Sequence, residues 1–163
     1  MTFDVNPFPN DPDRKAIWDV LVLRDIDAYL AGDWSLVQDD FIAEGFFGLH
    51  GMKSDNPDSW RMVFPRLEDY RDRWLEQSRV TAATHYAEPL RAALFRATNL
   101  IAIEISGDRA VAHKKFDGRI ARSDGGSDSI NWQTLYICAR AAGTWKIASF
   151  VGYLPFPMGT RHG

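Results

Sequence analysis

The feature that most constrains the fold is a change of pattern near Leu94. Before this residue the apolar side chains mostly recur at helical spacing, whereas after it β-type runs alternate with turns rich in glycine, serine and aspartate. The runs cover 95–105, 110–120, 130–140 and 145–154. Helices followed by consecutive strands are typical of the α+β class. We therefore predict an α+β fold in which N-terminal helices pack on one face of a strongly curved antiparallel sheet.

The first half of the chain predicts three helices. A long helix is expected over 13–31, because apolar residues recur at helical spacing until Gly32 stops it. A short helix follows over 33–40, and helical spacing returns over 66–83. The aromatic run 41–49 is broken by two glycines, and we interpret it as a strand that leads into a loop.

The length of 163 residues fits one domain with one core. We place this domain at 13–156, after an extended N-terminal arm over 1–12 that is rich in proline and asparagine and before a C-terminal tail over 157–163. The formal charge of -3 gives no electrostatic reason to bind nucleic acid or an anionic membrane. We therefore expect no nucleic-acid partner and no membrane partner.

The single Cys138 cannot form an internal disulfide, which favours a reducing compartment. The N-terminus has acidic residues and prolines where a signal peptide needs a basic start and an apolar run, so we expect a cytoplasmic protein. The sequence contains no HExxH motif or Cys/His cluster, no P-loop, no GxGxxG and no GxSxG. From these absences we expect neither a metal nor a cofactor.

Asp25 is the first candidate for acid–base chemistry. On a helical wheel it falls in a mostly apolar sector beside Trp18 and Leu21, and Tyr29 follows one turn later on the same face. Burial disfavours an ionised carboxylate, and this is how proteins tune an acid or a base toward neutral pH. The alternative is a structural role, in which Asp25 pairs with an arginine such as Arg24.

Two histidines are further catalytic candidates. His113 lies on a predicted strand where either face mixes polar and apolar groups, so a half-exposed structural position is an equally good interpretation. His50 follows an aromatic pair and stands next to a loop, where it could line the mouth of a pocket. Aromatic residues make up 13% of the chain and suit either a heavy core or a pocket for a flat apolar ligand. The ligand-binding candidates are Trp18, Phe46, Trp74 and Asn131.

Three segments of the chain form a recognisable set: LRDIDAYLAGDWSLVQDDF, ISGDRAVAH and ARAAGTWKIASF. Together they resemble the NTF2-like superfamily, which includes SnoaL-type polyketide cyclases, ketosteroid isomerases and scytalone dehydratases. The resemblance implies a cone-shaped α+β fold with a deep pocket and frequent dimerisation through the sheet. Within DAYLAGDW, Tyr29 matches the tyrosine of scytalone dehydratase, while Leu30 stands where that family has a catalytic aspartate.

Two functions follow from this resemblance. The first is a cofactor-independent lyase or isomerase, in which Asp25 or a histidine acts as the base and Tyr29 as the hydrogen-bond donor to an oxyanion. Its substrate would be a small, largely apolar cyclic or aromatic molecule. The second is a non-catalytic small-molecule-binding or accessory protein that uses the same pocket. In either case we expect a homodimer formed through the sheet face, which we expect to carry Trp132 and Tyr136.

Overall fold

The N-terminal helix is continuous but changes its winding in the middle. In the computed structural model, which describes residues 3–156, α1 (Pro12–Trp18) passes into a π-helical stretch, η1 (Asp19–Arg24), and then into α2 (Asp25–Ala31). The side chain of Asp11 caps the start by accepting a hydrogen bond from the backbone N–H of Arg14 at 3.1 Å. Gly32 ends the helix in the left-handed conformation, with φ of 67°. The helix therefore occupies the region that the sequence predicts.

Two further α-helices follow, α3 (Leu67–Ala83) and α4 (Leu90–Ala97). The first coincides with the predicted helix over 66–83. The second corrects the predicted strand over 95–105, because the chain is helical up to Ala97 and is extended only from Thr98 onward. Short 3-10 turns complete the helical content: η2 (Trp34–Leu36), η3 (Gln38–Asp40) and η4 (Pro57–Ser59).

The strands form a single mixed sheet. Its members are β1 (Phe47–His50), β2 (Arg61–Phe64), β3 (Thr98–Asn99), β4 (Ile103–Ser106), β5 (Arg109–Ala121), β6 (Ser127–Ala141) and β7 (Thr144–Leu154). The order is β2-β1-β7-β6-β5-β3, with β4 also paired to β5. The pairing of β1 with β7 is parallel, which corrects the prediction of an antiparallel sheet. The sheet is open at both edges and does not close into a barrel.

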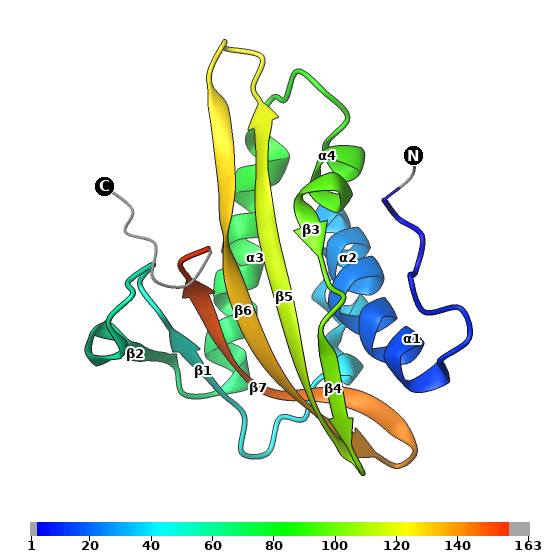
Figure 1. Cartoon of the computed structure of the whole chain (residues 1–163). Helices are drawn as coiled ribbons and strands as arrows, with labels where there is room; N and C mark the ends of the chain where they lie inside the picture. Colours follow the sequence, from blue (N-terminus) through cyan, green and yellow to red (C-terminus); the bar gives the residue numbers. More distant parts are fainter. Residues whose placement is uncertain (1–2, 157–163) are drawn as a thin grey trace.

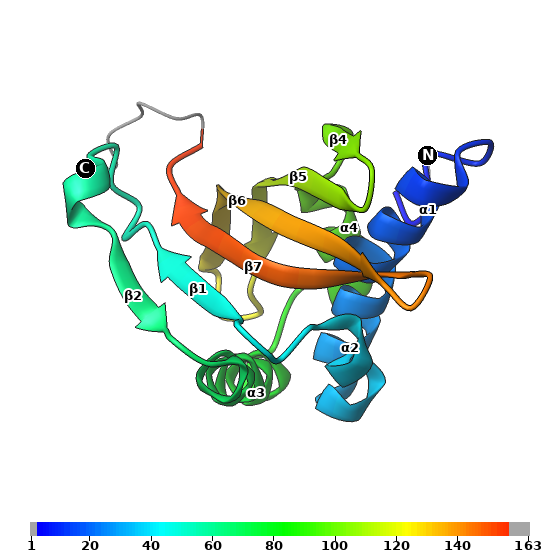
Figure 2. The ribbon, with the colours of Figure 1, turned by 90° about the horizontal axis from the view of Figure 1, so that it is seen from below.

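The sheet bends around the helices (Figure 1, Figure 2). Seen from below in Figure 2, the strands form an arc, and α2 and α3 lie across its concave side. Alternation along β5 and β6 sends one set of side chains to this concave face, where Ala112 pairs with Tyr136 and Tyr136 pairs with Phe150. The main hydrophobic core fills the space where the N-terminal helix meets the lower half of the sheet.

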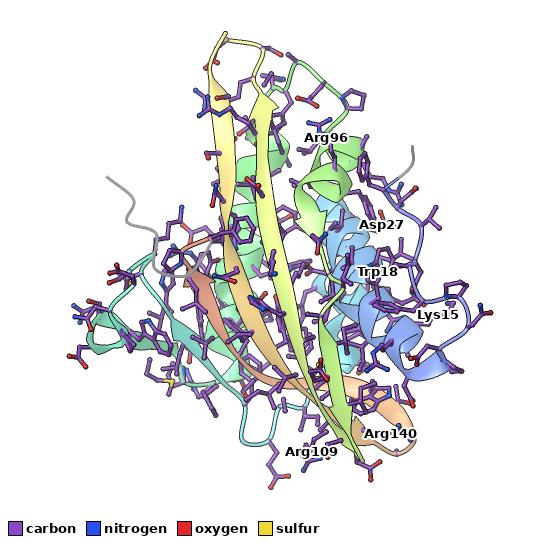
Figure 3. All side chains as sticks on the ribbon, viewed as in Figure 1. Lys15, Trp18, Asp27, Arg96, Arg109 and Arg140 are labelled. Carbon is purple, nitrogen blue, oxygen red and sulfur yellow. The ribbon has the colours of Figure 1, made fainter. Side chains whose placement is uncertain are left out.

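Charged side chains cover the ends and the outside of this core (Figure 3). Arg109 and Arg140 lie at the end of the sheet opposite the β5–β6 turn, and Arg140 forms an ion pair of 3.0 Å with Asp13 of α1. Within residues 3–156, no helix is long and apolar enough to cross a membrane. The predicted tail over 157–163 lies outside the described residues.

Candidate functional site

A cavity of about 540 Å³ lies between the concave face of the sheet and the helices α2, α3 and α4. It extends along β5 and β6 beyond the point where β7 ends, so the upper part of the β5–β6 hairpin forms one of its walls. Apolar surface dominates the wall because aromatic rings from every surrounding layer face inward. The aromatic residues of the wall are Tyr29, Tyr70, Trp74, Tyr86, Phe116, Trp132, Tyr136, Phe150 and Tyr153.

A charged cluster lies in this aromatic wall. Asp25, at the start of α2, accepts a hydrogen bond from the Nε1–H of Trp74 on α3 at 3.2 Å. Its other carboxylate oxygen forms an ion pair of 3.1 Å with Nζ of Lys114 on β5. Lys114 also donates to the backbone carbonyl of Leu21 and lies under the ring of Phe116, 5.0 Å from its centroid. Two elements that are distant in sequence, α3 and β5, thus fix the carboxylate that α2 carries.

Tyr29 lies one helical turn from Asp25 and also faces the cavity. Its hydroxyl shares a hydrogen bond of 2.7 Å with Oγ1 of Thr81 on α3, in which either oxygen can be the donor. The ring of Tyr29 meets Trp74 edge to face at 5.7 Å. Ser78 donates to the backbone carbonyl of Tyr29 at 2.6 Å, which ties α2 to α3 at this level. The phenol is therefore held in position by packing and by hydrogen bonds.

Three further phenols face the cavity with raised pKa values. Burial is the main cause for Tyr70, Tyr136 and Tyr153, and it takes the pKa of Tyr70 and of Tyr136 well above the ordinary value. The negative charge of Asp25 contributes to the raised pKa of all three. These phenols consequently keep their protons at physiological pH and are available as hydrogen-bond donors.

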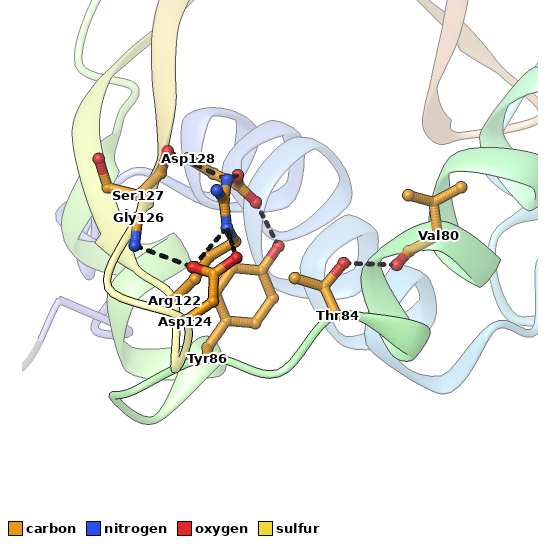
Figure 4. Close-up of polar contacts among 8 residues, drawn as sticks. All are labelled: Val80, Thr84, Tyr86, Arg122, Asp124, Gly126, Ser127 and Asp128. Atoms are coloured by element: carbon orange, nitrogen blue, oxygen red, sulfur yellow. Dashed lines mark hydrogen bonds and ion pairs between the residues drawn. The ribbon is translucent and has the colours of Figure 1, made fainter.

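A second polar cluster lies where the cavity reaches the β5–β6 hairpin, and its members Tyr86 and Asp128 belong to the cavity wall (Figure 4). Tyr86, on the connection between α3 and α4, donates to Asp128 at the start of β6 at 2.7 Å. Asp128 forms an ion pair of 2.6 Å with Arg122, which also contacts Asp124 at 3.3 Å. The backbone N–H of Gly126 donates to Asp124 at 2.8 Å. These contacts tie the helix connection to the tip of the β5–β6 hairpin.

Three of the eight predicted site residues line the cavity, namely Asp25, Tyr29 and Trp74. Trp18 and Phe46 do not line it. Both are almost fully buried in the hydrophobic core, where apolar neighbours surround their rings.

The two histidines and Asn131 lie on other surfaces. His113 and Asn131 point to the outer face of the sheet, because their neighbours Lys114 and Trp132 point inward. There the Nε2 atom of His113 contacts the side chain of Gln133. His50 stacks on the ring of Tyr153 with 4.1 Å between centroids. Within residues 3–156, none of these three side chains lines the cavity, although His50 contacts Tyr153, which does. Their roles in the site stay predictions.

His50 is the last residue of β1 and does not line the cavity. Its Nδ1 atom accepts a hydrogen bond of 2.9 Å from the backbone N–H of Met52. Burial lowers the pKa of His50, and the positive charges of Arg73 and Lys53 lower it further. The ring is therefore neutral at neutral pH.

Sequence analysis did not identify Lys114 or the three buried phenols of Tyr70, Tyr136 and Tyr153. A signal for Lys114 was present, since it shares a strand face with Ala110 and Ala112, and small apolar residues are typical of an inward face. Trp132 and Tyr136 were expected on the outer face of the sheet, and this expectation is wrong because both line the cavity. Within the described part of the chain, no group of three or more metal-ligating side chains comes together.

Comparison with solved structures identifies the fold. An NTF2-like protein of unknown function from Shewanella baltica aligns with 88% of this chain and 94% of its own, at 15% identity and a TM-score of 0.54. An NTF2-like superfamily protein from Salmonella enterica aligns over 90% and 94%, at 15% identity and a TM-score of 0.54. A protein from Nostoc punctiforme described as a domain of unknown function with a cystatin-like fold aligns over 88% and 77%, at 13% identity and a TM-score of 0.57.

No known family model matches the chain, and no curated protein sequence matches it significantly. The structural similarity nevertheless extends over most of each molecule and identifies an NTF2-like fold. The fold predicted from the sequence resemblance is thereby confirmed. A fold shared by enzymes and by non-catalytic proteins does not specify the chemistry, which has to be argued from the site itself.

Proposed function

We propose that this protein is a cofactor-independent lyase or isomerase, of the dehydratase or cyclase type, that moves a proton on a small, largely apolar cyclic or aromatic molecule. The observation that carries this proposal is the placement of the Asp25 carboxylate and the Tyr29 phenol in the wall of one aromatic cavity. A volume of about 540 Å³ suits a ligand of this kind.

Asp25 is the proposed base. It removes a proton from a carbon next to a carbonyl group, and the electron pair of that C–H bond shifts toward the carbonyl oxygen. Tyr29 donates a hydrogen bond to this oxygen, because its own hydrogen stays available when Thr81 donates in their shared hydrogen bond. The protonated Asp25 then returns the proton to another carbon, which completes an isomerisation, or to a departing hydroxyl group, which completes the loss of water.

Hydrogen–deuterium exchange tests this proposal without knowledge of the natural substrate. The protein is incubated in deuterated water with a panel of cyclic and aromatic ketones, and loss of the acidic C–H signal is followed by NMR. We expect Asp25→Asn to abolish catalysed exchange and Tyr29→Phe to slow it about a hundredfold or more. Asp27→Asn is the matched control, since Asp27 lies on the same helix but is exposed and paired with Arg91. Equal exchange rates in all variants would contradict the proposal.

One observation favours the second candidate function, non-catalytic binding. Both carboxylate oxygens of Asp25 already accept hydrogen bonds from the protein, one from Trp74 and one from Lys114. A carboxylate in this arrangement can also serve to shape a binding cavity. The same ketone panel separates the two functions: a compound that raises the melting temperature but shows no catalysed exchange supports a binding protein.

A homodimer through the outer face of the sheet remains part of the proposal, as does a cytoplasmic location. The support for the dimer is three exposed apolar residues in one row across the sheet: Val111 of β5 pairs with Ile137 of β6, and Ile137 and Phe47 of β1 pair with opposite sides of Ser149 on β7. Light scattering should give a mass of twice 18.5 kDa, and Ile137→Asp should halve it. Val80→Asp, at an exposed position on α3, is the control. A particle of 18.5 kDa at micromolar concentration would exclude the dimer.

A further inference from the structure

Lys114 is a buried cation whose position calls for a physical explanation. Its side chain is only 1% exposed, although it belongs to the cavity wall. Nζ donates to the backbone carbonyl of Leu21 and to the Asp25 carboxylate at 3.1 Å. Removing an ammonium group from water costs several kcal/mol unless an opposite charge and hydrogen bonds compensate for it. Here both kinds of compensation are present.

Stability alone does not explain this arrangement. A buried ion pair is often no more stabilising than two well-packed apolar side chains of similar volume. The strand already carries Ala110 and Ala112 on the same face, and the ring of Phe116 follows Lys114 on that face. An apolar residue at position 114 would therefore continue the pattern. The charge at position 114 is therefore better explained by a role of Lys114 in the candidate site than by stability.

We propose that Lys114 is the positioning residue that keeps the Asp25 carboxyl group ionised and oriented within the aromatic cavity. This inference rests on the proposed function of Asp25. The Asp25 side chain is 33% exposed, and the ammonium group of Lys114 lies 3.1 Å from one of its oxygens, where opposite charges attract. Trp74 and Lys114 each hold one oxygen, and each carboxylate oxygen retains a further lone pair that is available for a proton of the ligand.

The same ion pair responds to proton transfer. When Asp25 takes a proton, its negative charge disappears and the positive charge of Lys114 is no longer neutralised. The negative charge has moved to the oxygen of the ligand, so the total charge of the cavity is unchanged. Attraction between Lys114 and this oxygen then stabilises the intermediate in a site of low dielectric. Lys114 therefore interacts with the Asp25 carboxylate before the proton transfer and with the negatively charged oxygen of the ligand after it.

Other ionisable groups surround Asp25 and have to be considered in any titration. The phenols of the cavity have raised pKa values and stay neutral, and Asp40 is paired with Arg24 at 2.9 Å. Lys114 is thus the cation in direct contact with Asp25 among residues 3–156. The full set that shares a cavity with Asp25 is Tyr29, Asp40, Tyr70, Arg73, Glu76, Tyr86, Lys114, Asp128, Tyr136 and Tyr153.

The test follows the Asp25 carboxyl group directly. Protein labelled with ¹³C at aspartate carboxyl carbons is titrated by NMR, and the Asp25 signal is assigned as the one lost in Asp25→Asn. In Lys114→Met we expect the midpoint of this titration to move up, because the ammonium group 3.1 Å from the carboxylate is lost. The acidic limb of the pH–rate profile for ketone exchange should move by the same amount. Lys115→Met is the matched control, because Lys115 is the next residue on β5 and points to the outer face.

The outcomes separate this inference from the proposed function. A midpoint that moves by less than half a unit in Lys114→Met would overturn the role of Lys114, whatever the activity. A wild-type protein without ketone exchange would overturn the proposed function and leave the titration result standing. Lys114→Gln, which keeps a polar side chain for the Leu21 carbonyl, repeats the titration if Lys114→Met does not fold. Lys114→Arg keeps the positive charge and should therefore give the wild-type midpoint. A midpoint change caused only by lost packing would not be reversed in this variant.

Discussion

Gly118 controls how closely α4 approaches the sheet, and its replacement by alanine should displace this helix. A Cβ atom at Gly118 on β5 would lie 2.6 Å from the Cβ and 3.2 Å from the Cα of Ala97, the last residue of α4. Two carbon atoms normally approach to about 3.5–4.0 Å. The helix therefore has to move away by about 1 Å, and Leu90 and Leu94, which line the cavity, move with it.

The expected cost follows from two opposing effects. Overpacking of a well-packed interior costs about 1–3 kcal/mol. Replacing a glycine within a strand returns about 0.5–1 kcal/mol, because the unfolded chain loses less conformational freedom on folding. The net loss in the free energy of unfolding for Gly118→Ala is thus about 1–2 kcal/mol. At a urea m-value of roughly 2 kcal/mol/M, the unfolding midpoint falls by about 0.5–1 M.

Urea unfolding of four proteins tests this reasoning: wild type, Gly118→Ala, Ala97→Gly and the double variant. Ala97→Gly removes the methyl group that the new Cβ would contact, so the two changes together should cost at least 0.5 kcal/mol less than the sum of the single changes. Arg119→Ala, at the exposed neighbouring position, should alter stability by less than about 0.5 kcal/mol. Strict additivity, or a Gly118→Ala variant as stable as wild type, would refute a steric role for Gly118.

Three further predictions concern ionisable groups. The pKa of His50 is lowered in the folded protein, so the unfolded chain takes up this proton at a higher pH, and the free energy of unfolding should decrease as the pH falls from about 7 through the folded pKa. In urea unfolding at several pH values, His50→Asn should remove this decrease, and an unchanged pH dependence would contradict the prediction. Hydrogen bonds from Tyr86 and then Arg122 lower the pKa of folded Asp128, so Tyr86→Phe should cost about 1 kcal/mol at neutral pH. This cost should shrink as the pH falls below about 4, where an aspartate in the unfolded chain takes up a proton, and through the lower pKa of folded Asp128; a cost that is independent of pH would point to packing instead. Burial raises the pKa of Cys138 to about 12, so a thiol reagent should modify it only after unfolding, and rapid labelling of the native protein would disprove its inertness.

The helical half of the fold was largely predictable because its signals are local. The capping Asp11, the helical spacing and the terminal Gly32 define the first helix, and spacing alone defines α3. The α4 helix was missed because its second half, from Leu94 to Ala97, continues into an apolar run that also fits a strand. Pro89 just before the helix and the alanines within it were the signals for a helix start.

Long-range features could not be obtained from local patterns. The parallel pairing of β1 with β7 joins segments about 100 residues apart, and no turn signal encodes it. Because side chains alternate between the two faces of a strand, Trp132 and Tyr136 lie on the same face of the sheet. This alternation does not specify which face of the sheet is covered by helices. Lys114 was missed for a different reason: a lysine in a strand normally indicates a solvent-exposed face, and this outweighed the signal of Ala110 and Ala112 on the same strand face.

The candidate site was partly predictable for the same reason. Asp25 and Tyr29 share one helix face, so their i, i+4 spacing was sufficient to place them together. Trp74 joins them from a helix 49 residues further along the chain, and the sequence predicted only that its aromatic series packs inward. The ion pair with Lys114 depends on the register between β5 and the N-terminal helix, which is a property of the folded molecule.

The π-helical stretch Asp19–Arg24 places a strict limit on variation in chain length. A π-type turn accommodates one residue more than an α-helical turn. Deleting one residue here should permit a regular helix that keeps α1 and α2 in the same rotational register, whereas a regular helix formed without this deletion would rotate α1 by about 100° relative to α2. Ile17 and Trp18 would then turn from the core toward solvent, whereas Asp25 and Tyr29 would keep their places in the cavity. A related chain of the same length that lacks the widened turn must therefore carry the apolar residues of its first helix shifted by one position.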